Sequence, residues 1–164
     1  RAEARDREAA HERVGRLQVI EALGEVIGWH RDGIVPLGDQ LTGDARCTLR
    51  HADFFSLVDD GIETDDAGPR RFDAILVDID HTPSHHLNAA NARFYGPAGF
   101  ARVCDQLRPA GVFALWSDDP PDERFEALLR GTFADVTSHV VAFPNHYTGG
   151  ESACTVYVAV APDR

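Results

Sequence analysis

The chain has 164 residues, of which 43% are hydrophobic and 26% are charged. This length suffices for one compact core but is short for two ordinary domains, so we expect a single domain over residues 1–164. Acidic residues number 27 against 16 lysines and arginines, which gives a net charge of −11. A chain this acidic repels a phosphate backbone, and we therefore expect no nucleic acid as a partner.

Composition also bears on the compartment. No apolar run approaches the ~18 residues that a membrane span requires, and the first residues do not resemble a signal peptide. We therefore expect a cytoplasmic protein without a membrane partner. The three cysteines, Cys47, Cys104 and Cys154, are far apart in apolar stretches, which indicates buried thiols in a reducing compartment. The sequence has no methionine and begins at Arg1, so we expect the natural chain to start further upstream.

The first third of the chain alternates strand and helix patterns. Residues 1–13 hold strong helix formers with almost no apolar stripe, which fits an exposed helix or a frayed tail. They are followed by a strand pattern at 16–22, a short helix pattern at 24–30, an irregular segment rich in glycine at 31–44, and a second strand pattern at 46–51.

The rest of the chain continues this alternation and closes with two strands. Residues 72–79 form a nearly continuous apolar run, as expected of a central strand covered on both faces of a parallel sheet. The other predicted elements are a solvated loop at 59–71, a polar loop at 82–91, a helix at 97–107 that ends at 108–111, a strand at 111–116, a helix from the cap Asp122 to 129, and two strands at 133–143 and 153–161. Together they predict an α/β fold with a mostly parallel sheet and an antiparallel strand at its C-terminal end.

Three of the predicted strands end in acidic residues, namely Glu21, Asp53 and the pair Asp78 and Asp80. Ligands of open parallel sheets bind beyond the carboxyl ends of the strands. A carboxylate can accept hydrogen bonds from both hydroxyls of a ribose or from the amino group of a base. Each acid alone fits a solvated loop or a helix cap, whereas their repetition at successive strand ends predicts one nucleoside site.

Several runs of the sequence carry a family resemblance: RLQVIEALGEVIGWHR, CTLRHADFF, RRFDAILVDID, LRPAGVFALW and ANARFYGPAGF. Over roughly residues 14–160 the chain resembles the spermidine synthase branch of the class I S-adenosylmethionine-dependent transferases. The resemblance implies a Rossmann-like methyltransferase sheet. It also implies that the donor, used as a co-substrate, is S-adenosylmethionine or its decarboxylated form.

The resemblance further implies a small-molecule acceptor such as a polyamine, and a homodimer. It also implies a role for each acid and its neighbours. The residues that would bind the donor are Glu21 at the ribose, Asp53 at the adenine amino group, Ala52 and Phe54 beside the base, and Asp78 at the reacting centre.

The glycine pattern departs from that of the family. None of the 14 glycines forms the G-x-G turn that lets the backbone approach the methionine part of the donor. In the family this turn follows a first, central strand. We therefore expect that strand to be missing from the sheet, between the strands at 16–22 and 72–79, and its absence would leave two unpaired strand edges.

The catalytic element departs as well. In the family a D-x-x-D element follows the strand that corresponds to residues 72–79. Its second acid takes the proton of the attacking amine. Here the order is Asp78-Ile79-Asp80-His81, which brings the two acids closer together along the chain. We expect Asp78 and Asp80 to be catalytic, with Asp80 or His81 in the role of the family's second acid, and we expect Asp80, His81 and Tyr95 to line the acceptor site.

The sequence leaves three functions open: aminopropyl transfer to a polyamine, methyl transfer to a small molecule with the same donor contacts, and nucleoside binding without catalysis. A metal site is a further interpretation, because imidazole and carboxylate groups are ligands for zinc or iron. Their spacing matches no established metal motif, however. We therefore expect a polar loop and no metal at His81, His85, His86, Asp78 and Asp80.

Overall fold

The structure of the protein is a computed structural model that describes residues 13–62, 64–65, 68–69, 71–147 and 149–163. The chain forms two compact units, residues 1–57 and residues 58–164. The helix or tail expected at 1–13 lies, except for its last residue, outside the described residues.

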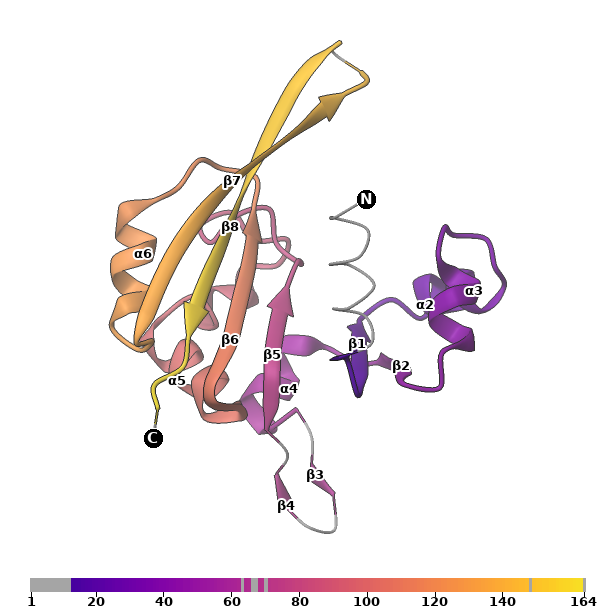
Figure 1. Ribbon diagram of the computed structural model, residues 1–164, viewed down its shortest axis with the longest axis horizontal. Coiled ribbons are helices and arrows are strands. Elements are labelled where there is room, and N and C mark those ends of the chain that lie inside the picture. The colour runs from indigo at the N-terminus through magenta and orange to yellow at the C-terminus, as the bar shows by residue number, and fades with distance from the viewer. Residues whose placement is uncertain (1–12, 63, 66–67, 70, 148, 164) are drawn as a thin grey trace. The chain divides into compact units, whose positions relative to one another are not determined.

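The first unit contains a parallel pair of strands joined by helices (Figure 1). Strand β1 (Leu17–Glu21) and strand β2 (Cys47–His51) pair in parallel along their full lengths, so both strands have their carboxyl ends at the same edge of the pair. Helix α2 (Gly24–Arg31) follows β1 directly. The predicted order of strand, helix and strand is therefore confirmed.

The connection between α2 and β2 contains a helix that the sequence did not predict. An irregular segment is expected at 31–44, but α3 (Gly38–Gly43) forms within it. Leu37 precedes the helix with a left-handed backbone, φ 65°. A side chain at Gly38 would place its Cβ 2.8 Å from the carbonyl oxygen of His30. The prediction was wrong because this glycine, which weakens a helix pattern locally, is what allows α3 to approach α2.

The second unit is built around a four-stranded sheet with the order β5-β6-β8-β7. Strands β5 and β6 run parallel, and β8 runs antiparallel to both β6 and β7, so the predicted mixed sheet is confirmed (Figure 1). The larger elements are α4 (Phe54–Asp60), which begins in the first unit, β5 (Phe72–Val77), the 3-10 helix η1 (Ala89–Arg93), α5 (Pro97–Gln106), β6 (Leu107–Ser117), α6 (Glu123–Arg130), β7 (Asp135–Asn145) and β8 (Gly150–Val160). No helix in the described part of the chain is long and apolar enough to cross a membrane.

Two predicted loops contain regular structure instead. The segment 59–71 holds the end of α4 and a short antiparallel pair, β3 (Thr64–Asp65) and β4 (Gly68–Pro69). Residues 108–111, expected to end the helix, already belong to β6. Local composition marked both segments as breaks, but β3 and β4 pair with each other and the strand that contains 108–111 pairs with β5.

The core of the second unit lies between one face of the sheet and the helices α5 and α6. Phe113 of β6 is fully buried and stacks on Phe133, with ring centroids 5.6 Å apart. Phe100 of α5 contacts Phe113 at 5.8 Å and Phe125 of α6 at 5.7 Å. Phe125 contacts Tyr157 of β8 at 4.8 Å. These aromatic contacts hold both helices on the sheet.

Among the described residues of the second unit, strand β5 is covered on one face only. Ile75 and Val77 are buried, whereas Leu76 between them is 72% exposed. The prediction of a central strand covered on both faces is therefore wrong for this sheet, where β5 is the first strand in the order. The reason is that α5 and α6 pack on the same side (Figure 1), because right-handed crossovers that advance in one direction place their helices on one face.

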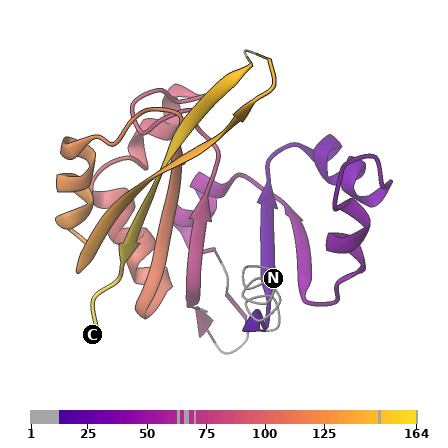
Figure 2. The same ribbon diagram turned by 45° about the horizontal axis from the view of Figure 1, so that its top comes forward.

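Strands β7 and β8 extend beyond the rest of the sheet as a two-stranded arm (Figures 1 and 2). Strand β6 pairs with β8 only from Thr155 to Val160, whereas β7 and β8 remain paired out to Asn145 and Gly150. The two strands expected at the C-terminal end are thereby confirmed, and they pair as a hairpin. Large apolar side chains exposed on the arm include Val140, Val141, Phe143 and Tyr147.

Candidate functional site

In the first unit, two of the predicted acids lie at the same edge of the parallel pair. Glu21 is the last residue of β1, and Asp53 follows the end of β2. The N–H of Ala52 donates to the carbonyl oxygen of Glu21 at 3.0 Å, which joins the two strand ends. The Glu21 carboxylate accepts from the N–H of Leu23 at 2.8 Å. A carboxylate has about four acceptor positions, so this bond leaves capacity for ribose hydroxyls.

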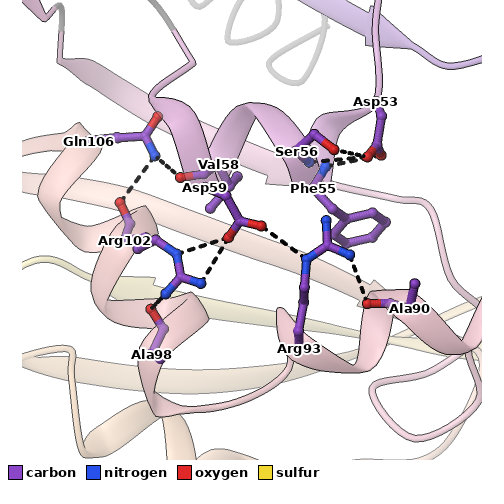
Figure 3. Close-up of polar contacts among 10 residues, drawn as sticks. All are labelled: Asp53, Phe55, Ser56, Val58, Asp59, Ala90, Arg93, Ala98, Arg102 and Gln106. Carbon is purple, nitrogen blue, oxygen red and sulfur yellow. Dashed lines mark hydrogen bonds and ion pairs between the residues drawn. The ribbon is translucent and has the colours of Figure 1, made fainter.

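Asp53 also caps helix α4 (Figure 3). Its carboxylate accepts from the N–H of Phe55 at 3.2 Å, and from the N–H and hydroxyl of Ser56 at 3.1 and 2.5 Å. Such bonds satisfy N–H groups that have no partner within the helix. The ring of Phe54 is 7% exposed and packs edge-on against Phe55, with centroids 5.6 Å apart. Phe54 is therefore mostly enclosed, and its contact with a base stays a prediction.

A charged cluster connects the second half of α4 to η1 and α5 (Figure 3). The Asp59 carboxylate accepts from Nε of Arg93 and from Nε of Arg102, each at 2.9 Å. The side-chain amide of Gln106 donates to the carbonyl oxygen of Val58 at 3.0 Å. Hydrogen bonds from the two guanidinium groups lower the pKa of Asp59 from its ordinary value, and the bond from Arg93 has a larger effect than the bond from Arg102. Within the second unit, the cluster thus holds Val58 and Asp59 against η1 and α5.

Replacing Asp59 by Asn should lower the free energy of unfolding at neutral pH, because an amide cannot form ion pairs with the two arginines. A carboxyl group with a lowered folded pKa stabilises the fold above its unfolded pKa of about 3.9, and this contribution is lost as the pH falls through the folded value. Urea unfolding should therefore show a deficit at pH 7 that shrinks below about pH 4. The control is Asp60→Asn, at an exposed neighbour; equal losses in both variants would contradict the assignment.

In the second unit, two acids follow β5 at the carboxyl edge of the parallel pair β5 and β6. Asp78 comes directly after the last residue of β5 and is exposed. Asp80 is 3% exposed. The structure thus distinguishes the two acids that the sequence treated as a catalytic pair, because one is open to solvent and the other is enclosed by protein.

The Asp80 carboxylate accepts hydrogen bonds from three residues of the segment that follows it. The N–H of Leu87 donates at 2.6 Å, the amide of Asn91 donates to both oxygens at 3.0 and 3.1 Å, and the Tyr95 hydroxyl donates at 2.9 Å. Burial, followed by the hydrogen bond to Asp80 and its negative charge, raises the pKa of Tyr95 far above the ordinary value. Tyr95 therefore stays protonated and keeps donating. Asp80 thereby holds the segment 81–95 at the end of β5.

His81 faces an acid that the sequence analysis missed. Its Nδ1 lies 3.4 Å from Oδ2 of Asp118, which directly follows β6, and the two side chains are 51% and 53% exposed. The backbones are joined as well, because the N–H of Asp118 donates to the carbonyl oxygen of His81 at 2.8 Å. The signal was present in the sequence, since Asp118 also follows the end of an apolar strand.

The other histidines of this loop have separate protein neighbours. The ring of His85 lies 5.0 Å from that of His81, centroid to centroid. The ring of His86 stacks on Tyr95 at 4.7 Å, and its Nε2 lies 2.8 Å from the carbonyl oxygen of Pro83. Among the residues that the structure describes, no group of three or more His, Cys, Asp or Glu side chains is arranged to hold a metal ion.

The segments that follow β5 and β6 are acidic up to Arg93 and Arg124. The segments 78–92 and 117–123 contain no lysine or arginine. Clustered carboxylates create a negative potential that attracts cations. The acidic residues of these segments are Asp78, Asp80, Asp118, Asp119, Asp122 and Glu123.

Comparison with known proteins finds this fold in solved structures of a spermidine synthase and of methyltransferases. No family model matches the sequence, and no curated protein matches it. Among solved structures, a spermidine synthase from Thermotoga maritima aligns with 92% of this chain at a TM-score of 0.64 and 16% identity. The N-methyltransferase NodS from Bradyrhizobium japonicum aligns with 90% at a TM-score of 0.56 and 14% identity. An O-methyltransferase from Bacillus cereus, in complex with S-adenosylhomocysteine, aligns with 88% at a TM-score of 0.53 and 16% identity.

The chain has a Rossmann-like methyltransferase fold. The aligned region covers 47% of the spermidine synthase, 74% of NodS and 62% of the O-methyltransferase. This chain therefore spans about half the length of the spermidine synthase that it resembles. The expected α/β fold with antiparallel C-terminal strands is confirmed, while the roles of the individual site residues stay predictions.

Proposed function

We propose that the protein is a transferase that moves a carbon group from a sulfonium nucleoside, S-adenosylmethionine or its decarboxylated form, to a small cationic amine. The observation that carries this proposal is the acidic carboxyl edge of β5 and β6, where Asp78 and Asp118 are exposed. A cluster of carboxylates there favours an acceptor that carries positive charge. The fold likeness to a spermidine synthase and to methyltransferases supports the choice of donor.

The residues of the first unit would bind the nucleoside. Glu21 would accept from the ribose hydroxyls, because it ends β1 and has acceptor capacity beyond its bond from Leu23. Asp53 would accept from the adenine amino group, with Ala52 and Phe54 beside the base. Glu21 and Asp53 follow adjacent parallel strands, so both lie where ligands of such sheets bind.

The residues after β5 would bind the acceptor. Asp78 would bind its ammonium group, because it is the exposed acid that directly follows β5. Asp80 would act as a positioning residue that keeps Tyr95 and the loop of His81 in place. Because the sulfonium carbon is already electrophilic, most of the rate enhancement would come from alignment of the amine nitrogen with the carbon–sulfur bond that breaks.

Aminopropyl transfer to a polyamine is the first form of this proposal, because a polyamine carries several ammonium groups that match several carboxylates. Methyl transfer to an amine is the alternative, and the likeness to the N-methyltransferase NodS favours it. The two reactions differ in their products: aminopropyl transfer releases methylthioadenosine, whereas methyl transfer releases S-adenosylhomocysteine.

Incubation of the chain with each donor and putrescine tests the proposal. We expect putrescine-dependent release of methylthioadenosine, with a preference for the decarboxylated donor. A rise in melting temperature with donor measures binding separately from turnover. Glu21→Gln should lose much of this rise, whereas Asp73→Asn, at an exposed acid of β5, should keep it. Stabilisation without release of either product would instead support nucleoside binding without catalysis, and the absence of both effects would contradict the proposal.

A further inference from the structure

The pairing of His81 with Asp118 is built into the ends of two neighbouring strands. Strands β5 and β6 run parallel and remain paired up to Val77 and Leu115. The backbone bond from Asp118 to His81 then joins the segments that follow them. The 3.4 Å separation between Nδ1 of His81 and Oδ2 of Asp118 is therefore set by main-chain geometry as well as by side-chain attraction.

Asp80, the acid that the sequence favoured for proton transfer, is poorly suited to it. Its two oxygens already accept from Leu87, Asn91 and Tyr95, and the side chain is buried. Protonation would disrupt bonds that hold the loop. His81 is half exposed, and an imidazole is the side chain suited to exchanging protons near neutral pH.

We propose that His81, oriented by Asp118, takes up the proton that the acceptor ammonium loses before it attacks. This inference rests on the proposed function. With Nδ1–H directed at Asp118, Nε2 keeps its lone pair and can accept the proton. The groups that face the imidazole are Asp118 after β6 and the ring of His85 in its own loop.

The step balances without a further reactant. The ammonium group gives one proton to Nε2 of His81, and the resulting imidazolium lies beside the Asp118 carboxylate. The free electron pair of the amine nitrogen then attacks the sulfonium carbon, and the carbon–sulfur bond breaks with its electron pair passing to sulfur. The donor leaves as a neutral thioether, the new amine carries the positive charge, and the imidazolium returns its proton to water.

The test compares turnover, donor binding and chemical rescue. His81→Gln should lower kcat by about 100-fold at neutral pH, and the loss should shrink at high pH, where the acceptor amine is deprotonated without a base. The donor-induced rise in melting temperature should stay as in the wild type. Added imidazole should restore part of the activity of His81→Ala, which a purely structural loss would not allow. Asp118→Asn, as a positioning variant, should lower kcat by about tenfold with little change in KM.

Two matched controls lie on β7, which β8 separates from β6: His139→Gln and Asp135→Asn, both at exposed positions. They should leave activity unchanged. If His81→Gln retains the wild-type kcat, or imidazole fails to rescue His81→Ala, this inference is overturned while the proposed function stands. A wild-type chain that consumes neither donor overturns the proposed function and this inference together.

Discussion

Replacing Asp78 by Asn is expected to lower kcat/KM for the amine acceptor by about 1000-fold. Asp78 is the exposed acid at the carboxyl end of β5, where the proposed acceptor binds. Its charge would bind the ammonium group of the acceptor, and an amide in its place offers no charge to that group. Steady-state rates with putrescine and the decarboxylated donor measure the effect, which should appear in both KM and kcat.

The control for Asp78→Asn is the same substitution near the other end of the same strand. Asp73 is 83% exposed and forms an ion pair with Arg108 at 3.1 Å. Because Asp73 lies at the opposite edge of the sheet, Asp73→Asn should leave kcat/KM unchanged. Unfolding stability should be similar in the two variants. A wild-type KM for putrescine in Asp78→Asn would show that the acceptor is held elsewhere.

Replacing Asp80 by Ala is expected to lower the free energy of unfolding by about 3 kcal/mol, because it leaves buried donors without an acceptor. The N–H of Leu87, the amide of Asn91 and the hydroxyl of Tyr95 all donate to this carboxylate. An unpaired buried donor is costly because water cannot replace the lost partner. Urea unfolding monitored by circular dichroism gives the difference directly.

Two further variants keep this result interpretable. Tyr95→Phe removes one donor and leaves the carboxylate with its other partners, so the loss should be smaller, about 1 kcal/mol. Asp135→Ala, at an exposed position of β7, should change stability by less than about 0.5 kcal/mol. If Asp80→Ala is as stable as Asp135→Ala, the carboxylate does not hold the loop, and a direct role at the acceptor becomes the better assignment.

Features that depend on local pattern were predictable from the sequence. The strand ends Glu21 and Asp78, the helix after Pro97 and the cap at Asp122 follow from residues close together in the chain. The structure confirms the cap, since Asp122 accepts from the N–H of Arg124 at 2.8 Å. The location of acids after strands therefore followed from the sequence, because strand periodicity and capping are short-range effects.

Features that depend on contacts between distant residues were decided by the tertiary structure. The sequence could not show that Asp80 is enclosed while Asp78 is open, because that difference arises when Asn91 and Tyr95 fold back onto the end of β5. It did not pair His81 with Asp118, because only the parallel alignment of β5 and β6 brings them together. The sequence thus determines which chemical groups follow each strand. The burial of each side chain and its hydrogen-bond or ion-pair partner are determined only when separate strands and loops pack against one another.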